Sequence, residues 1–488
     1  MRMFWSGSVD QPWSWTIILG LLFSAGSARA RDNFLIIALD DVGVDTINVY
    51  SRDDLYGHPG EGAGPGPTNT IDQLAAGGVL FRNAYTNPTC SPTRAATLSG
   101  RYGFRTGIGT PAQVDLPLSE VLIPEMLGTS WMNAAIGKWH LSPQPEITNP
   151  NDAGFDHYAG SLAGELDDYY DYTKVVNGSA TSNHTVYATT DEADEAIQAI
   201  QSFGENPWCV WLAFHAPHRP FHDPPATLHT QDLATNPGNT PSYKAMIEAV
   251  DTELGRLFQS IPTGVFDDTT VILFGDNGTP GTRTELPFRK HRAKGTVYEG
   301  GINVPFIVKS PHIDPADEGS ESTSLISTVD IFATLADIGG VAASTEDSLS
   351  LLPYLADPGL ATQAARPFVY AEKFSPNGLG PYTSHEKAVR DETYKLIWRD
   401  GTFEEFFNLN DDPWEQNNLL PLNNLSSVEL TAYGNLVAAT NNPRVTVPEP
   451  LSLVLCAAGL ACLGAGQRGR RRVGGVRSIT ISFLSAFP

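Results

Sequence analysis

The chain has 488 residues, enough for one large domain with an appendage or for two or three smaller domains. Its 31 basic and 55 acidic residues give a net charge of −24, which argues against nucleic acid as a partner because phosphate binding needs positive charge. A hydrophobic content of 41% is typical of a globular protein, and a mean hydropathy of −0.17 excludes a protein with many membrane-spanning helices.

The first part of the chain has the features of a secretory signal. A short apolar run at residues 16–28 ends in Ala28-Arg29-Ala30, which is an A-x-A cleavage pattern. We therefore predict that residues 1–30 are a signal peptide that is removed on export. The alternative is that this run forms a buried strand or helix of the mature fold.

The first predicted strand covers Asn33–Leu39. Its apolar residues run on without alternation, which is typical of a parallel strand buried on both faces. Asp40 and Asp41 follow directly, and two adjacent carboxylates in such a place repel each other unless a cation compensates them. The pair therefore indicates a cation site, although a solvated turn or a helix cap would also explain it.

The segment Cys90-Ser91-Pro92-Thr93-Arg94 predicts the start of a helix. Pro92 suits the first turn, because its missing N–H would be unpaired there in any case. Cys90 then lies at the helix entrance, where the free N–H groups and the helix dipole favour negative charge. Arg94 lies one turn further on and can reach back toward Cys90, so we expect an anion beside residue 90. A buried structural cysteine is the alternative.

Further strands and helices alternate along the chain. Strands are predicted at residues 134–136, 209–214, 270–274 and 304–308, and helices at residues 71–76, 191–203, 243–259 and 326–339. This alternation predicts a wound α/β sheet, which we assign to residues 31–365.

Several of these strands end in polar or ionisable residues, namely Lys138, His215, Asp276 and Asn277. Ligands bind beyond the carboxyl ends of the strands in open α/β sheets, so we expect these side chains to meet Asp40 and Asp41. Three carboxylates and an amide form an all-oxygen set that suits Ca²⁺ or Mg²⁺ rather than Zn²⁺.

Residues 366–425 are predicted to form a smaller C-terminal antiparallel subdomain. A strand of mixed pattern covers residues 385–398, Gly401-Thr402 reads as a turn, and a second strand covers residues 403–409. Residues 426–446 then form a linker.

The end of the chain is similar to the PEP-CTERM sorting tail of Gram-negative bacteria. Val447-Pro-Glu-Pro450 precedes an apolar stretch to Gly466, and arginines follow between residues 468 and 472. The resemblance implies that a sorting protease of the exosortase type recognises residues 447–472. It also implies export across the inner membrane to the periplasm, the cell surface or the medium. An ordinary C-terminal anchor helix is the alternative, and neither interpretation explains residues 473–488.

A set of motifs in the predicted α/β domain and after it resembles the sulfatase family. Cys-x-Pro-x-Arg followed by Ser99-Gly100-Arg101 looks like the sulfatase signature. The other matching segments, in the family's order, are Gly137-Lys138-Trp139-His140, residues 213–218, Gly275-Asp276-Asn277-Gly278, residues 294–305 and residues 409–419. The resemblance covers residues 33–420, with one departure at Asn303, where an Arg is common.

This resemblance implies an alkaline phosphatase-like α/β fold, in which a large mixed, mostly parallel sheet is sandwiched by helices. It also implies an arylsulfatase-like sulfuric ester hydrolase. In the family a maturase converts the cysteine to formylglycine, whose hydrated aldehyde is the nucleophile. The implied ligands of Ca²⁺, with Mg²⁺ as the alternative, are Asp40, Asp41, modified Cys90, Asp276 and Asn277. The implied catalytic residues are Cys90, Arg94, Lys138, His140, His215 and Lys294.

The family also implies a role for each catalytic side chain. Arg94 stabilises the nucleophile, Lys138, His215 and Lys294 hold the sulfate of a sulfated small molecule or glycan, and His140 withdraws the proton that regenerates the aldehyde. Either His215 or Lys294 protonates the leaving alcohol. His218 receives no role. The loop at residues 59–69 and the segment at residues 159–183, with Tyr169, Tyr170 and Tyr172, are expected to line the substrate entrance.

Two other functions fit the same residues. A phosphonate monoester or phosphodiester hydrolase could use the same formylglycine. A non-catalytic surface protein could bind sulfated glycans through the same cations with Cys90 unmodified.

Overall fold

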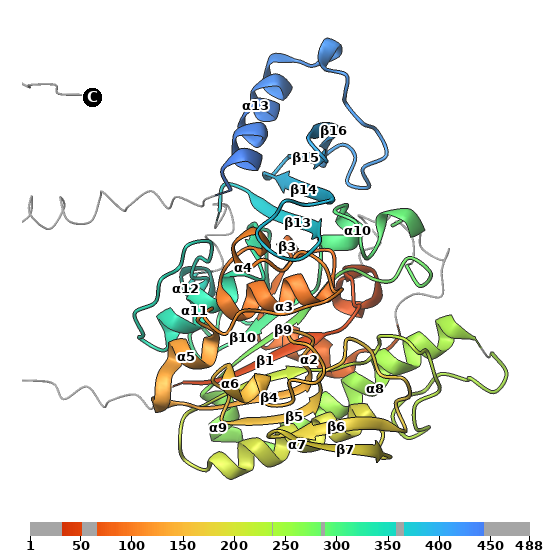
Figure 1. Cartoon of the computed structure of the whole chain (residues 1–488), viewed down its shortest axis with the longest axis vertical. Coiled ribbons are helices and arrows are strands. Elements are labelled where there is room, and N and C mark those ends of the chain that lie inside the picture. The colour runs from red at the N-terminus through yellow and green to blue at the C-terminus, as the bar shows by residue number, and fades with distance from the viewer. Residues whose placement is uncertain (1–31, 51–65, 237, 285–287, 358–365, 444–488) are drawn as a thin grey trace, which may run out of the picture. The chain divides into compact units, whose positions relative to one another are not determined.

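The computed structural model describes residues 32–50, 66–236, 238–284, 288–357 and 366–443 (Figure 1). The predicted signal peptide, the predicted sorting segment at 447–472 and the tail at 473–488 lie outside the described residues. The domain boundaries drawn from the sequence stay predictions. Among the helices that are described, none combines the length and the apolar character needed to cross a bilayer.

The core of the protein is a ten-stranded mixed sheet. Its strands, in spatial order, are β11 (Ser320–Ser322), β2 (Val79–Phe81), β10 (Phe306–Lys309), β9 (Thr269–Gly275), β1 (Asn33–Leu39), β8 (Trp208–Ala213), β4 (Met132–Lys138), β5 (His157–Ser161), β6 (Tyr172–Val176) and β7 (Ser179–His184). The central run from β9 to β5 is parallel, whereas β10, β6 and β7 pair in antiparallel fashion. The predicted α/β sheet is therefore confirmed.

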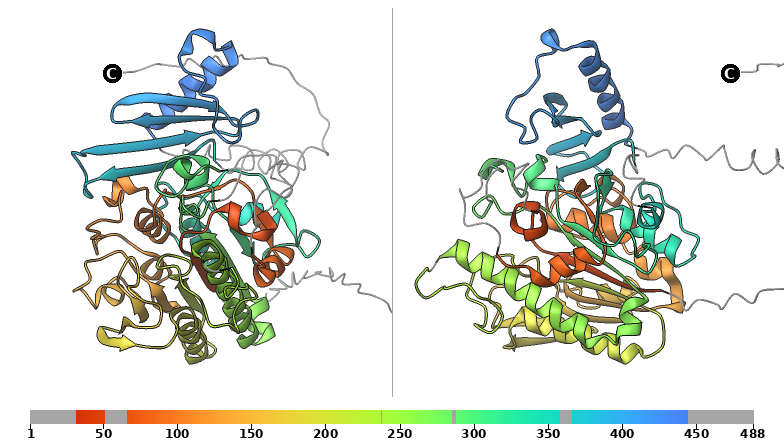
Figure 2. Two further views of the ribbon diagram at one scale, coloured as in Figure 1. Left: turned by 90° about the vertical axis from the view of Figure 1, so that its right-hand side faces the viewer. Right: turned by 180° about the vertical axis from the view of Figure 1, so that it is seen from behind.

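Helices cover both faces of this sheet (Figures 1 and 2). Alternate residues of β1 enter two different cores, with Phe34 and Ile36 in one and Leu35 and Ile37 in the other. The first core includes residues of α3 (Cys90–Ser99), α5 (Ile123–Leu127), α11 (Asp330–Ile338) and α12 (Leu352–Ala356). The second includes residues of α2 (Asn69–Ala76), α7 (Ala188–Phe203) and α8 (Asn239–Ser260). Burial on both faces explains why the central strands are apolar throughout.

The remaining elements are short. They are the helices α4 (Gly103–Thr106), α6 (Asn149–Asp152), α9 (Thr263–Asp267) and α10 (Glu299–Ile302) and the paired strands β3 (Ala84–Tyr85) and β12 (Ile326–Ser327). The helix predicted at residues 326–339 is wrong at its start, because residues 326 and 327 form β12. The Asp330 carboxylate accepts the Ser327 N–H at 2.8 Å and so links the first residue of α11 to the last residue of β12.

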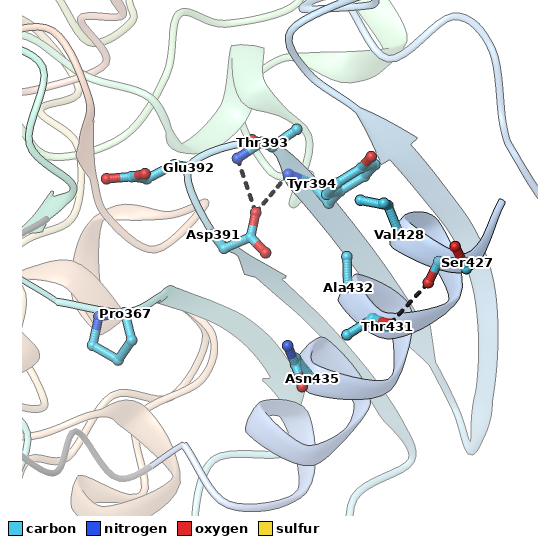
Figure 3. Close-up of a pocket in the computed structure, with 10 residues that line it drawn as sticks. All are labelled: Pro367, Asp391, Glu392, Thr393, Tyr394, Ser427, Val428, Thr431, Ala432 and Asn435. Atoms are coloured by element: carbon cyan, nitrogen blue, oxygen red, sulfur yellow. Dashed lines mark hydrogen bonds between the residues drawn. The ribbon is translucent and has the colours of Figure 1, made fainter. Parts of the chain in front are cut away.

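A smaller antiparallel sheet follows, made of β13 (Val369–Ser375), β14 (Ser384–Arg390), β15 (Tyr394–Arg399) and β16 (Thr402–Asn408), with α13 (Ser427–Asn441) packed on it. The single strand predicted at residues 385–398 is wrong. The Asp391 carboxylate accepts the N–H groups of Thr393 and Tyr394 at 2.8 and 2.7 Å, and this turn separates β14 from β15 (Figure 3). The same turn and α13 line a cavity of about 670 Å³.

Candidate active site

Polar side chains from four neighbouring strands meet at one edge of the central sheet. The strands lie in the order β9, β1, β8 and β4 and run parallel, so their carboxyl ends lie side by side. The residues at or just after these ends are, in that order, Asp276 and Asn277, Asp40 and Asp41, His215, and Lys138. The fold thus brings together residues that are distant in the chain.

Each of the three carboxylates is paired with a cation. The pairs are Asp40 with Lys138 at 2.5 Å, Asp276 with Arg94 at 2.8 Å, and Asp41 with Lys294. All of these side chains are at most 4% exposed except that of Lys294, at 20%. Buried charges are costly unless they are paired, so the cations offset the cost of gathering three carboxylates in one place. Lys294 marks the side that opens to solvent.

The two adjacent aspartates ionise differently. Burial raises the pKa of Asp40 well above its usual range despite the Lys138 ammonium, and the neighbouring carboxylates add to this rise. Burial has the same tendency at Asp41, but there Lys294 and His218 hold the pKa below the usual range. A further cation in the site would therefore favour the ionised form of Asp40 most strongly.

Unpartnered oxygen atoms indicate where such a cation fits. Asp40 Oδ1 and Asn277 Oδ1 are buried and have no hydrogen-bond partner among the described residues. Asn277 Nδ2 donates to Asp41 Oδ1 at 2.9 Å, which holds the amide beside the aspartates. Asp40, Asp41 and His218 also offer ligand atoms that all lie within 4.8 Å of one another. These carboxylate and amide oxygens suit Ca²⁺ or Mg²⁺, and they lie beside His218, to which the sequence analysis gave no role.

Cys90 is the first residue of α3, and 3% of it is exposed. Its Sγ lies 3.4 Å from His140 Nδ1. Arg94 lies close enough to Cys90 for the two groups to interact electrostatically, but the guanidinium donates its hydrogen bonds to Asp276 and, through Nη1, to the Lys138 carbonyl at 2.9 Å. A buried carboxylate accepts guanidinium N–H groups much more strongly than a thiol does.

His140 faces Cys90 with a nitrogen that can accept a proton. Its main chain is left-handed, with φ at +54°, just beyond the end of β4. The other ring nitrogen, Nε2, lies 3.2 Å from the Pro111 carbonyl, which can only accept, so Nε2 carries the proton and Nδ1 the lone pair. Burial lowers the pKa of His140 to about 3, and Lys138 and Arg94 act in the same direction. The ring is therefore neutral at neutral pH.

His215, directly after β8, is held by a residue that the sequence analysis missed. Its Nδ1 lies 2.5 Å from Glu192 Oε1, and its backbone N–H donates to Glu192 Oε2 at 3.3 Å. His215 Nε2 is buried without a hydrogen-bond partner among the described residues. Glu192 lies one turn from both Ala188 and Ala196 on the buried face of α7. A carboxylate within an apolar stripe of a helix is the sequence feature that could have pointed to it.

Tyr169 holds the main chain of the segment that carries His215 and His218. Its hydroxyl lies 2.8 Å from the His215 carbonyl and 2.7 Å from the His218 carbonyl, and it is 1% exposed. The expectation that Tyr169 lines the substrate entrance is therefore wrong, because its ring is enclosed in the core and its hydroxyl is used to orient the main chain.

A cavity of about 540 Å³ opens above these residues. Its lining comprises Asp41, Cys90, Pro111, His140, Gln144, Gly164, Glu165, His218, Arg219, Phe221, Pro280, Thr282 and Lys294. Cys90, Lys294, His140 and His218 therefore border one space. A second cavity, of about 580 Å³, shares Pro111, His140, Gln144 and Gly164 with the first.

Comparison with known protein families gives two matches. Residues 32–341 match a family model described as Sulfatase, and residues 290–440 match one described as N-sulphoglucosamine sulphohydrolase, C-terminal. The first match alone covers more than half of the chain and includes every residue of the candidate site.

Individual proteins are also similar. The chain is 26% identical to a protein named Uncharacterized sulfatase YdeN from Escherichia coli (strain K12), over 68% of this chain and 67% of that one. It is 29% identical to N-acetylgalactosamine-6-sulfatase from Sus scrofa, over 76% and 75%. Among solved structures, Ps i-CgsB in complex with k-i-k-neocarrahexaose superposes with a TM-score of 0.69 at 22% identity, covering 90% of this chain and 98% of that one. The similarity to the Ps i-CgsB structure shows that the two proteins share a fold.

Proposed function

Because the chain belongs to the sulfatase family and is a sulfuric ester hydrolase, we propose that it removes sulfate from a sulfated glycan with a formylglycine made from Cys90 and a bound Ca²⁺. The observation that carries this proposal is the single cavity that Cys90 shares with Asp41, His140 and Lys294. The formylglycine would supply an oxygen nucleophile, and the cation would polarise it. One set of residues would hold the cation and another would hold the sulfate.

The cation would be held by Asp40, Asp41, Asp276 and Asn277, with an oxygen of modified Cys90 in reach of the same space. The unpartnered oxygens of Asp40 and Asn277 support this assignment, since a cation would satisfy both. Arg94 fixes Asp276 through two of its nitrogens and so keeps one carboxylate in place for the ion.

The sulfate would lie among cations and hydrogen-bond donors. Lys138 and Lys294 carry positive charge on either side of the aspartates, and His215 Nε2 lacks a partner that a sulfate or ester oxygen would supply. His140 would take up a proton from the oxygen that replaces the Cys90 sulfur, because its Nδ1 lone pair faces that residue.

His215 is a better candidate than Lys294 for protonating the leaving alcohol. Although burial opposes it, the Asp41 carboxylate raises the pKa of Lys294 above its usual range, so this ammonium gives up its proton reluctantly. We therefore assign Lys294 to sulfate binding and His215 to proton donation.

The size and rim of the site support a glycan as the substrate. The two cavities adjoin at His140, so the space beside residue 90 continues past the point where a sulfate would be held. Gln144, Arg219 and Thr282 offer hydrogen bonds to sugar hydroxyls, and Phe221 offers an apolar face. The pig relative is named as a sulfatase of N-acetylgalactosamine, and the Ps i-CgsB structure is a complex with k-i-k-neocarrahexaose.

Export and processing remain part of the proposal. Signal residues 1–30 would direct the chain across the inner membrane of a Gram-negative bacterium, and an exosortase-type protease would act on residues 447–472. A formylglycine-generating maturase must oxidise Cys90 with an external oxidant before the enzyme is active.

Hydrolysis of matched esters by the full chain, co-expressed with a maturase, tests the proposal. We expect turnover of 4-nitrophenyl sulfate and of sulfated oligosaccharides, loss of turnover after chelation, and recovery with Ca²⁺. Turnover of nitrophenyl phosphate or phosphonate esters alone would contradict it. Binding of sulfated glycans without any turnover would favour the non-catalytic alternative.

A further inference from the structure

Glu192 is a buried carboxyl group that the reaction outlined above does not use. It lies in α7 with 4% of its surface exposed, and both of its hydrogen bonds are made with His215. The salt bridges of the described residues pair it with His215 alone. A fully buried carboxyl group devoted to one imidazole is costly to maintain, which suggests that it serves that imidazole.

The main chain is shaped to admit this contact. A Cβ on Gly137 would lie 3.3 Å from Glu192 Oε1 and 2.2 Å from the Ala213 carbonyl, and the φ of Gly137 is +85°. Glycine is thus required where β4 passes between α7 and the end of β8. Three segments of the chain therefore combine to place one carboxyl group against one ring nitrogen.

The contact of 2.5 Å between Glu192 Oε1 and His215 Nδ1 requires a proton between the two atoms, because two lone pairs at that distance would repel each other. Burial raises the pKa of Glu192 well above its usual range and lowers that of His215 well below it, and both shifts favour a protonated carboxyl group beside a neutral imidazole. One proton is then shared between Glu192 Oε1 and Nδ1, and a second remains on Nε2. The groups that face the pair are Asp191, Asp40 and Arg94 around Glu192, and Lys138, Arg94, His218 and His140 around His215.

Resting on the proposed sulfatase reaction, we propose that Glu192 is a positioning residue that keeps a proton on His215 Nε2 and replaces it through Nδ1 when the ester oxygen departs. In that step the oxygen nucleophile at residue 90 would bond to sulfur as the bond from sulfur to the ester oxygen breaks. The Nε2–H bond breaks, and an O–H bond forms on the alcohol. The Glu192 proton moves to Nδ1, so the imidazole stays neutral and Glu192 becomes a carboxylate. Water, the second reactant of the hydrolysis, restores the missing proton.

Substituted phenyl sulfates test this role, because a poor leaving group depends on protonation more than a good one does. In Glu192→Gln the amide can still bond to Nδ1 but cannot supply a proton. We expect kcat/KM for 4-methoxyphenyl sulfate to fall about 100-fold and that for 4-nitrophenyl sulfate to fall less than about 10-fold. An equal loss for every ester would overturn the proposal.

A matched control lies next to Glu192 on the same helix. Asp191 is also a buried carboxylate, but it pairs with Lys174 Nζ at 2.7 Å rather than with His215. Asp191→Asn removes a charge that faces Glu192 but no hydrogen bond to His215, so it should change the dependence on the leaving group much less than Glu192→Gln does. A shift as large as that of Glu192→Gln would count against a specific role for Glu192.

Nitrogen NMR of the ¹⁵N-histidine-labelled protein gives a readout that needs no activity. With His215 assigned by its loss in His215→Gln, we expect Nε2 to stay protonated from about pH 6 to 8 and to exchange tautomers in Glu192→Leu. A bare Nε2 in the unaltered protein would overturn the proposal. A protonated Nε2 in a protein that hydrolyses no sulfate ester would support the pair and contradict the proposed function instead.

Discussion

The candidate site contains two histidines with opposite roles: His140 presents a ring nitrogen without a proton, and His215 presents one with a proton. His140 follows β4 and is backed by the Pro111 carbonyl, whereas His215 follows the neighbouring strand β8 and is backed by the Glu192 carboxyl group. A carbonyl can only accept, which leaves a lone pair facing Cys90. A protonated carboxyl group, the form that burial favours for Glu192, donates to Nδ1 and leaves the proton of a neutral ring on Nε2. The partner behind each ring thus decides whether the ring accepts or donates a proton.

The largest expected effect comes from replacing Cys90, the residue that would carry the nucleophile. Cys90→Ala should lower kcat by at least about 10⁴-fold, because no oxygen nucleophile can be made at residue 90. Cys209→Ala is the matched control, since that thiol is buried in β8 outside the site and should leave kcat within about twofold of the unaltered value. Equal losses in the two variants, measured with 4-nitrophenyl sulfate, would contradict the assignment.

Exchanging each histidine for glutamine separates the two sides. His140→Gln should lower kcat by about 100-fold or more to a similar extent for good and poor leaving groups, because its proton comes from the nucleophile side. His215→Gln should lower kcat increasingly as the leaving alcohol becomes more basic. The comparison fails if both variants give the same plot of log kcat against the pKa of the leaving group.

A smaller effect is expected from crowding His140. A Cβ on Gly164 would lie 2.2 Å from His140 Cε1, so Gly164→Ala should push the ring away from Cys90 and lower kcat about 10-fold. Gly434→Ala, in α13, meets nothing within 4 Å and should leave kcat unchanged. Full activity of Gly164→Ala would show that the position of this ring is unimportant.

The smallest effect concerns stability and pH. Burial lowers the pKa of folded His140 to about 3 from an unfolded value of about 6.5, so the unfolded chain binds more protons between these values. Its contribution to the free energy of unfolding is complete above about pH 6.5 and falls by up to about 1.4 kcal/mol per pH unit as the pH decreases. Urea unfolding from pH 7 to 4 should show a shallower pH dependence for His140→Gln. An unchanged slope would contradict a neutral, buried ring.

The sheet and the meeting of the strand ends could be predicted from the sequence, because they depend on patterns along single strands. The apolar run before Asp40 and the polar residues after β8 and β9 both fix where parallel strands end. Cys90 and Pro92 likewise predict the start of α3 from local chemistry alone, and the structure begins the helix there.

Contacts that depend on how elements pack could not be predicted in this way. Glu192 lies on a helix without a recognisable motif, and only packing of α7 beneath β4 and β8 brings it to His215. The preference of Arg94 for Asp276 over Cys90 depends on a carboxylate distant in the chain. The turn at Asp391 is a local signal that the mixed pattern of the surrounding strands concealed.

Mass measurement of the peptide that contains Cys90 tests the central claim most directly. The full chain would be co-expressed with a formylglycine-generating maturase, purified in its active form and digested. We predict that sulfur is replaced by an aldehyde oxygen at residue 90, in proportion to the sulfatase activity of each preparation. An intact Cys90 thiol in a fully active preparation would contradict the account.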